Sequence, residues 1–183
     1  VLAAANSYTE LHNDIVLNAD LRIGDFNDGD DSDYGGIRLD FNSVGLHGDI
    51  SGGGGLVIYG NVELHGHNSY EGGTLLAGFA HLSSSDSLGP GLIEVRNVDD
   101  FTAGLSAYGD IVLSNDLLLD GDLFTYNPSG SFTFEGDITL HRTVTLGFYG
   151  VAPHVTGDIT GFATLFLQNS GTAPLWLSGA NSY

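Results

Sequence analysis

Three observations predict that this chain folds as an all-β solenoid of roughly nine short coils. A Leu-x-x-x-Asn-Ser-Tyr phrase occurs three times, short apolar runs alternate with turn residues, and no apolar stretch of helical length is free of glycine. Internal repetition indicates stacked units that share one continuous core. We therefore expect a single β-solenoid domain, residues 1–183, that is a slice or a repeating unit of a longer array.

The Asn-Ser-Tyr phrase is the clearest repeat. Its copies run from Leu2 to Tyr8, from Leu64 to Tyr70 and from Leu177 to Tyr183. We expect the tyrosines to cover the edge of the core at corners, and the asparagine amides to cap turns or to stack from coil to coil. The alternative is a row of tyrosines that stack on a glycan. The repeat-motif residues are Asn6, Ser7, Tyr8, Asn68, Ser69, Tyr70, Gly72, Gly73, Thr74, Asn181, Ser182 and Tyr183.

Short runs of β-forming residues predict the strands. Examples are 55–60, 61–65, 109–113 and 131–135, each bounded by Gly, Asn, Asp or Ser. The 28 glycines would weaken any helix, so we expect essentially none. The turn at 127–130 fits either a local hairpin or a solenoid corner.

A second recurrent phrase, Gly/Asn-Asp-Ile/Leu, predicts corners. Gly or Asn permits a left-handed conformation, Asp accepts backbone hydrogen bonds, and the following residue turns inward. Two spacings suggest the coil length: Leu46-His47-Gly48 recurs after 18 residues, and Gly136-Asp137-Ile138 recurs after 21. The phrase is centred on Asp14, Asp49, Asp110, Asp116, Asp122, Asp137 and Asp158.

Composition limits the function. The chain has 23 acidic residues against four arginines, a formal charge of −19, so we expect no nucleic-acid partner. It contains no run of ~18 apolar residues, so we expect no membrane insertion by this segment. The chain contains no cysteine or lysine, which excludes thiolate and Schiff-base chemistry in these residues. Residue 1 is valine, so we expect a processed product or an internal slice of a longer chain.

The segment 25–36 is the best candidate metal site. Carboxylate and amide oxygens on a flexible loop suit calcium, although the spacing departs from an EF-hand and a solvated acidic loop is the alternative. Calcium is the cofactor that this segment predicts. The candidate ligands are Asp25, Asn27, Asp28, Asp30, Asp31 and Asp33.

A second candidate metal site follows from the 18-residue spacing. It would place His47 against His65 and Asp49 against His67, a set that zinc or copper could use. The alternative is that these histidines lie on a solvated strand face.

A pair of carboxylates is spaced as in a retaining glycosidase. Asp137 and Asp158 would stack at ~5 Å, although a repeating corner produces the same spacing. We assign no catalytic residue and expect no enzyme.

One stretch carries a family resemblance. Residues 48–74, with a Gly-x-Ile-x-Gly-x-Gly-x-Leu opening and a Leu-x-Gly-x-Asn-x-Tyr-x-Gly-Gly-Thr centre, and then Leu88-Gly-Pro-Gly91, resemble the autotransporter-associated β-strand repeat of bacterial passenger domains. The resemblance implies a right-handed parallel β-helix displayed outside the cell and implies no catalytic residue. The first copy departs from the pattern, because it continues as Thr9-Glu10-Leu11.

These observations together predict a structural protein at the bacterial cell surface or outside the cell: a passenger-like stalk or a filament subunit. Since neither end shows an obvious polar cap, we expect head-to-tail association of identical copies. The alternatives are a glycan-binding adhesin and a calcium-dependent polysaccharide lyase with Arg22 or Arg38 as the base.

Overall fold

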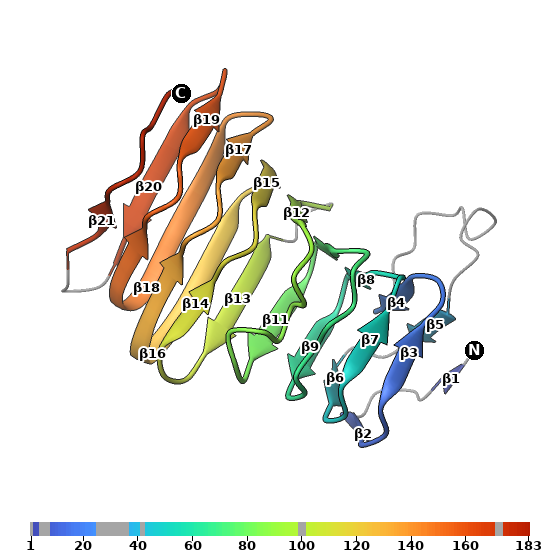
Figure 1. Cartoon of the computed structure of the whole chain (residues 1–183). Coiled ribbons are helices and arrows are strands. Elements are labelled where there is room, and N and C mark those ends of the chain that lie inside the picture. The colour runs from blue at the N-terminus through green and yellow to red at the C-terminus, as the bar shows by residue number, and fades with distance from the viewer. Residues whose placement is uncertain (1, 4–7, 25–36, 41–42, 99–101, 171–173) are drawn as a thin grey trace.

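The computed structural model describes residues 2–3, 8–24, 37–40, 43–98, 102–170 and 174–183. These residues form β-strands joined by turns and contain no helix, and so no helix that could cross a membrane. The strands stack in parallel as a β-solenoid, with the N-terminal strands at one end of the stack and the C-terminal strands at the other (Figure 1). The predicted fold class is confirmed.

Two long sheets and one short sheet form the walls of the solenoid. The first sheet has the order β1 (Leu2–Ala3), β5 (Ile37–Asp40), β4 (Leu21–Ile23), β8 (Leu56–Ile58), β10 (Thr74–Leu76), β12 (Ile93–Arg96), β15 (Leu117–Asp120), β17 (Ile138–Leu140) and β19 (Ile159–Gly161). The second sheet runs through β2 (Thr9–Leu11), β6 (Ser43–Leu46), β9 (Asn61–Leu64), β11 (Phe79–Leu82), β13 (Ala103–Ala107), β16 (Leu123–Phe134), β18 (Val144–Val155) and β20 (Leu165–Asn169). In addition, β14 (Ile111–Leu113) pairs with β16, β21 (Trp176–Leu177) pairs with β18, and β3 (Ile15–Leu17) pairs with β7 (Ile50–Gly52) in the third sheet.

The register confirms both predicted coil lengths. Leu46 pairs with Leu64, 18 residues further on, and Ile138 pairs with Ile159, 21 residues further on. Residues in equivalent positions of successive coils therefore lie at the spacing of neighbouring strands, about 4.8 Å. This spacing brings side chains that are far apart in the sequence into columns along the walls.

The number of coils is slightly smaller than the roughly nine predicted from an average length of ~20 residues. The coil that begins at Thr9 is long, since Thr9 pairs with Val44. Another long step joins Phe79 to Gly104. Strand β5 follows β4 in the sequence but adds no coil toward the C-terminal end, because it pairs with the edge of β4 opposite to β8.

The turn at 127–130 is a solenoid corner and not a hairpin. It lies inside β16, which pairs in parallel with β18 on both sides of a register shift after Asn127. The side chain of Asn127 organises the corner: Oδ1 accepts the Gly130 N–H at 2.9 Å, and Nδ2 donates to the Gly109 carbonyl of the preceding coil at 2.7 Å.

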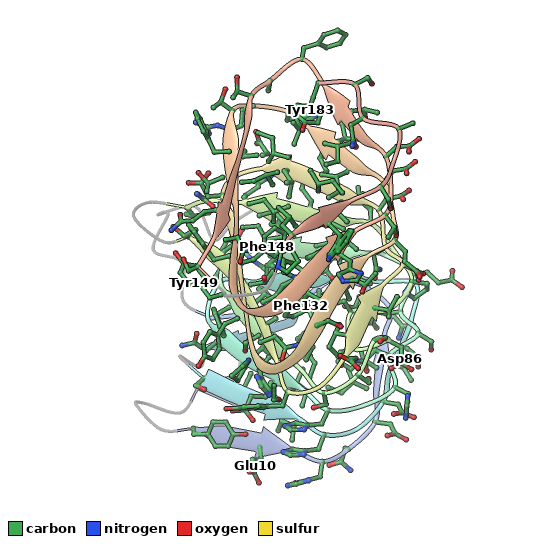
Figure 2. The ribbon with its side chains drawn as sticks, turned by 90° about the vertical axis from the view of Figure 1, so that its left-hand side faces the viewer. Glu10, Asp86, Phe132, Phe148, Tyr149 and Tyr183 are labelled. Atoms are coloured by element: carbon green, nitrogen blue, oxygen red, sulfur yellow. The ribbon has the colours of Figure 1, made fainter. Side chains whose placement is uncertain are left out.

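The interior is a continuous column of aliphatic and aromatic side chains. Short strands alternate inward and outward residues, so that Ile138 and Leu140 are buried and Thr139 is exposed. Figure 2 shows Phe132 and Phe148 between the walls, where each is 2 % exposed. This shared core makes each coil dependent on its neighbours for burial.

The predicted corner aspartates all make the same contact. Each accepts a backbone N–H of the following coil, at distances between 2.6 and 3.0 Å. The glycine of the phrase has a different role from the one predicted: only Gly109 among these glycines has a positive φ. At Gly136 and Gly157, a Cβ would lie 2.0 Å from a carbonyl oxygen of the preceding coil, so close approach of the backbones requires glycine there.

Candidate functional site

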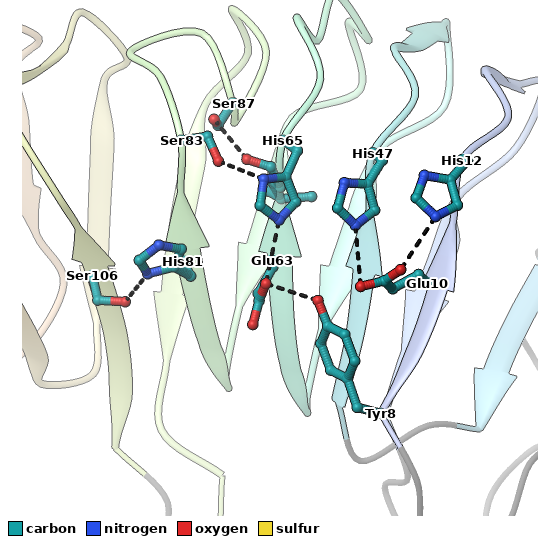
Figure 3. Close-up of polar contacts among 11 residues, drawn as sticks. Tyr8, Glu10, His12, His47, Glu63, His65, His81, Ser83, Ser87 and Ser106 are labelled. Atoms are coloured by element: carbon teal, nitrogen blue, oxygen red, sulfur yellow. Dashed lines mark hydrogen bonds and ion pairs between the residues drawn. The ribbon is translucent and has the colours of Figure 1, made fainter.

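A histidine ladder is the most distinctive cluster of chemically active side chains in the described part of the chain. His12, His47 and His65 each follow an inward leucine of β2, β6 or β9, and these leucines are in register. The imidazole centroids are 4.4 Å apart between His12 and His47 and 4.2 Å apart between His47 and His65, with interplanar angles of 19° and 3° (Figure 3). The predicted contact between His47 and His65 is confirmed.

Sequence reasoning missed His12, although a signal was present. Leu11-His12-Asn13 matches Leu46-His47-Gly48, with Asn in place of Gly at the corner. The match was obscured because 35 residues separate these two phrases, far from the 18-residue spacing of the next pair.

Two glutamates border the histidine ladder. Glu10, Gly45 and Glu63 occupy one column, two residues before the imidazoles. The phenol of Tyr8 lies over Gly45, where a Cβ would come within 2.5 Å of the phenol oxygen, and it donates to Oε2 of Glu63 at 2.8 Å. Glycine at position 45 therefore makes room for the hydroxyl that satisfies Glu63.

These contacts fix the protonation of the pair at neutral pH. The hydrogen bond to Glu63, together with burial, raises the pKa of Tyr8 to about 12. The same hydrogen bond and a second one with His65 hold the pKa of Glu63 below its usual value. Tyr8 is thus a neutral donor and Glu63 an ionised acceptor.

The three imidazoles differ in their partners. His65 has a partner on each ring nitrogen: Glu63 lies 3.2 Å from Nε2 and Ser83 lies 3.0 Å from Nδ1. Nε2 of His12 lies 3.2 Å from Glu10 Oε2. Nε2 of His47 is buried and has no hydrogen-bond partner, and its nearest carboxylate oxygen, Glu10 Oε1, lies 3.9 Å away. Glu10, His12 and His47 bring one ligand atom each within 4.8 Å of one another.

The other half of the predicted histidine patch is built differently. Asp49 contacts His67 through the backbone, since its Oδ1 accepts the His67 N–H at 2.8 Å. The imidazole of His67 lies 2.7 Å from Asp86 Oδ2, and this hydrogen bond raises the pKa of His67. The structure therefore groups His47 with His12 and His65, and pairs His67 with Asp86.

The predicted carboxylate pair also serves the backbone. Asp137 Oδ1 accepts the Asp158 N–H at 2.9 Å, and Asp158 Oδ1 accepts the Ala180 N–H at 2.6 Å. Both aspartates belong to the corner column. The six predicted calcium ligands of segment 25–36 lie outside the described residues.

The repeat motif is structural in its central copy. Asn68 Oδ1 accepts the Ile50 N–H at 2.8 Å and its Nδ2 donates to the Ser87 carbonyl at 2.6 Å, so one amide joins three coils. Tyr70 is 0 % exposed, and its hydroxyl lies 2.6 Å from the hydroxyl of Thr74.

The flanking residues of this copy also hold the backbone. The Ser69 N–H donates to the Ile50 carbonyl at 2.7 Å. Gly73 has φ +79°, a conformation that favours glycine. A Cβ on Gly72 would lie 2.5 Å from the backbone of Gly54, so the close approach of the two coils requires glycine there as well. Asn6 and Ser7 of the first copy lie outside the described residues.

In the outer copies the tyrosines are exposed. Tyr8 is 46 % exposed and Tyr183 is 51 % exposed, and Figure 2 shows Tyr183 near one end of the stack. Tyr70 lies within the core, and the expectation that the tyrosines cover the core edge is wrong for the exposed Tyr8 and Tyr183.

Comparisons of the chain with protein-family models, curated proteins and solved structures found no match.

Proposed function

We propose that this chain is a structural β-solenoid, a stalk or filament subunit whose coils continue head-to-tail into another copy. The single observation that carries the proposal is the open core at both ends of the described stack. Leu165 and Leu167 are only partly buried, whereas their partners in the preceding coil, Val144 and Leu146, are 2 % and 0 % exposed.

The N-terminal end of the stack has the same character. Leu11 and Ile15 are partly buried, and their partners Leu46 and Ile50 are 1 % and 0 % exposed. An end with apolar strips and free strand edges favours association with another β-structure. Because the strands at the two ends run in the same direction, one copy can add to another without reversal, which is a heterologous contact that forms open filaments.

The last coil supports continuation rather than capping. Asn181 Oδ1 accepts the Ile159 N–H at 3.0 Å, as Asn68 Oδ1 accepts from Ile50. A following coil would supply the carbonyl that Ser87 supplies to Asn68. Ala180 takes the next place in the corner column after Asp158, so no carboxylate stands there at the end of the stack.

The location outside the cell or on a bacterial surface rests on the resemblance of residues 48–74 to the passenger-domain repeat, and on the acidic composition. A stalk or filament of this kind needs no catalytic residue. Its partner is a second copy of this chain.

A charge placed on the open core is expected to block assembly. Leu167→Glu should weaken end-to-end association at least tenfold, because stacking would bury an unpaired carboxylate. Phe166→Glu is the matched control: it adds the same charge in the same strand, at an outward side chain that is 58 % exposed. Sedimentation velocity over a concentration series and negative-stain electron microscopy give the readout. Equal association of both variants, or a monomeric unmodified chain at high concentration with calcium present, would contradict the proposal.

A second candidate function, glycan binding, is favoured by an aromatic row on the outward face of the second sheet. Tyr126 pairs in register with Tyr149, Phe124 lies against Tyr149 at 5.7 Å between centroids, and Tyr126 is 51 % exposed. Exposed aromatic faces can pack against the C–H face of a sugar ring. Saturable binding on a glycan array is the expected result. Tyr126→Ala should abolish this binding and Tyr183→Ala should retain it, whereas an array without saturable binding would rule the glycan function out.

A further inference from the structure

We propose that Glu10, His12 and His47 bind one divalent transition-metal cation of the zinc type on the side wall of the solenoid. The site joins the first coil of the described stack, which carries Glu10 and His12, to the next coil, which carries His47 (Figure 3). It lies on the outer face of the coil that forms the N-terminal end of the described second sheet, because Glu10 and His12 flank Leu11 of β2.

The donor set selects the class of metal. Two imidazole nitrogens and one carboxylate are typical ligands of zinc and copper, whereas calcium and magnesium prefer sites made of oxygen atoms. With three protein ligands, a tetrahedral ion would keep one position for water.

The buried Nε2 of His47 is the observation that points to a ligand. This atom has no hydrogen-bond partner among the described residues, although the neighbouring imidazoles of His12 and His65 both have partners. A buried polar nitrogen without a partner is destabilising. A cation held between His47 and Glu10 would satisfy the nitrogen and neutralise the carboxylate.

The distances fit a site that closes slightly on the ion. The ligand atoms lie within 4.8 Å of one another, whereas two ligands of one zinc ion are no more than about 4.2 Å apart. The adjustment falls on side chains that are free to move, because the side chains of His12 and Glu10 are 67 % and 48 % exposed. His47, at 27 % exposure, forms the fixed part of the site.

The column of Glu10, Gly45 and Glu63 explains why Glu10 is the carboxylate that binds. Glu63 is already engaged by the Tyr8 hydroxyl and by His65. The printed contacts of the Glu10 carboxylate are with imidazole nitrogens of His12 and His47, at 3.2 and 3.9 Å. His65 is satisfied on both ring nitrogens and is therefore a neighbour of the site and not a ligand.

Titration with zinc chloride alone, followed by isothermal calorimetry, tests the proposal on the unmodified chain. We expect saturation at one zinc ion per chain. His12→Ala and Glu10→Gln should each weaken binding at least tenfold. His65→Ala should change it by less than twofold, and a large excess of calcium should not displace the zinc.

His141→Ala is the control for adventitious binding, since His141 is an exposed histidine elsewhere on the surface. Far-UV circular dichroism checks that each variant keeps its β-structure, and ¹⁵N NMR of the imidazoles reports ligation at Nε2 directly. The proposal is overturned if zinc binds equally to all variants, if calcium displaces it, or if zinc leaves the Nε2 signals of His12 and His47 unchanged.

Discussion

Replacement of Tyr70 by alanine is expected to lower the free energy of unfolding by about 4 kcal/mol, one of the largest effects of any single change in this chain. Tyr70 is 0 % exposed, and burial raises its pKa, so the ring is held as a neutral phenol inside the core. The ring also lies against the backbone of Gly89, where a Cβ would come within 3.3 Å of it. Its removal leaves a cavity that the closely spaced coils cannot fill.

The repeat supplies a matched control. Tyr183→Ala removes the same residue from the same phrase, but at an exposed position, and should change stability by less than about 1 kcal/mol. Tyr70→Phe removes only the hydroxyl that contacts Thr74 and should lower stability by about 1 kcal/mol. Equilibrium unfolding in urea measures all three. Similar losses for Tyr70→Ala and Tyr183→Ala would show that the central copy has no special role in the core.

Asn68→Ala is expected to lower the free energy of unfolding by about 3 kcal/mol. Its side chain is 5 % exposed and satisfies the Ile50 N–H of the preceding coil and the Ser87 carbonyl of the following one. Alanine would leave both backbone groups buried without a partner. Hydrogen exchange should show the loss locally, as faster exchange of the Ile50 amide.

Asn181→Ala and Asn68→Asp test the explanation. Asn181 makes the same accepting contact, with Ile159, but is exposed, so its loss should lower stability by less than about 1 kcal/mol. Asn68→Asp keeps the acceptor for Ile50 but sets a carboxylate against the Ser87 carbonyl, and should be at least as damaging as alanine. If Asn68→Asp were neutral, the amide nitrogen would have no role in joining the coils.

The coil-to-coil register could be predicted wherever a phrase recurs with little change. Leu46-His47-Gly48 and its repeat 18 residues later gave the pairing of Leu46 with Leu64, and the corner phrase identified seven aspartates that accept a backbone N–H of a following coil. It missed Asp20, which accepts the Gly55 N–H in the same way but follows an alanine. These predictions succeed because stacked coils place the same physical demands on the same position. A corner needs an acceptor at one place and an inward apolar residue at the next.

The first coil could not be placed in the same way. Thr9 pairs with Val44 after 35 residues, and β5 pairs outside β4, so sequence distance no longer measures position along the stack. The site at Glu10 depends on that pairing, because only the register brings His12 next to His47. The space for the Tyr8 phenol likewise depends on Gly45. Only the strand register shows that Gly45 lies between Glu10 and Glu63.

The corner aspartates also bear on the order in which the coils fold. In all seven contacts the carboxylate belongs to the earlier coil and the N–H to the later one. A chain that folds as it emerges, N-terminus first, would present hydrated carboxylates at its unfinished end until the next coil supplies the donors. An unfinished strand edge fringed with charge resists pairing with other chains. The carboxylates that join adjacent coils in the folded chain would thus also keep the edge of the partly folded chain from pairing with other chains.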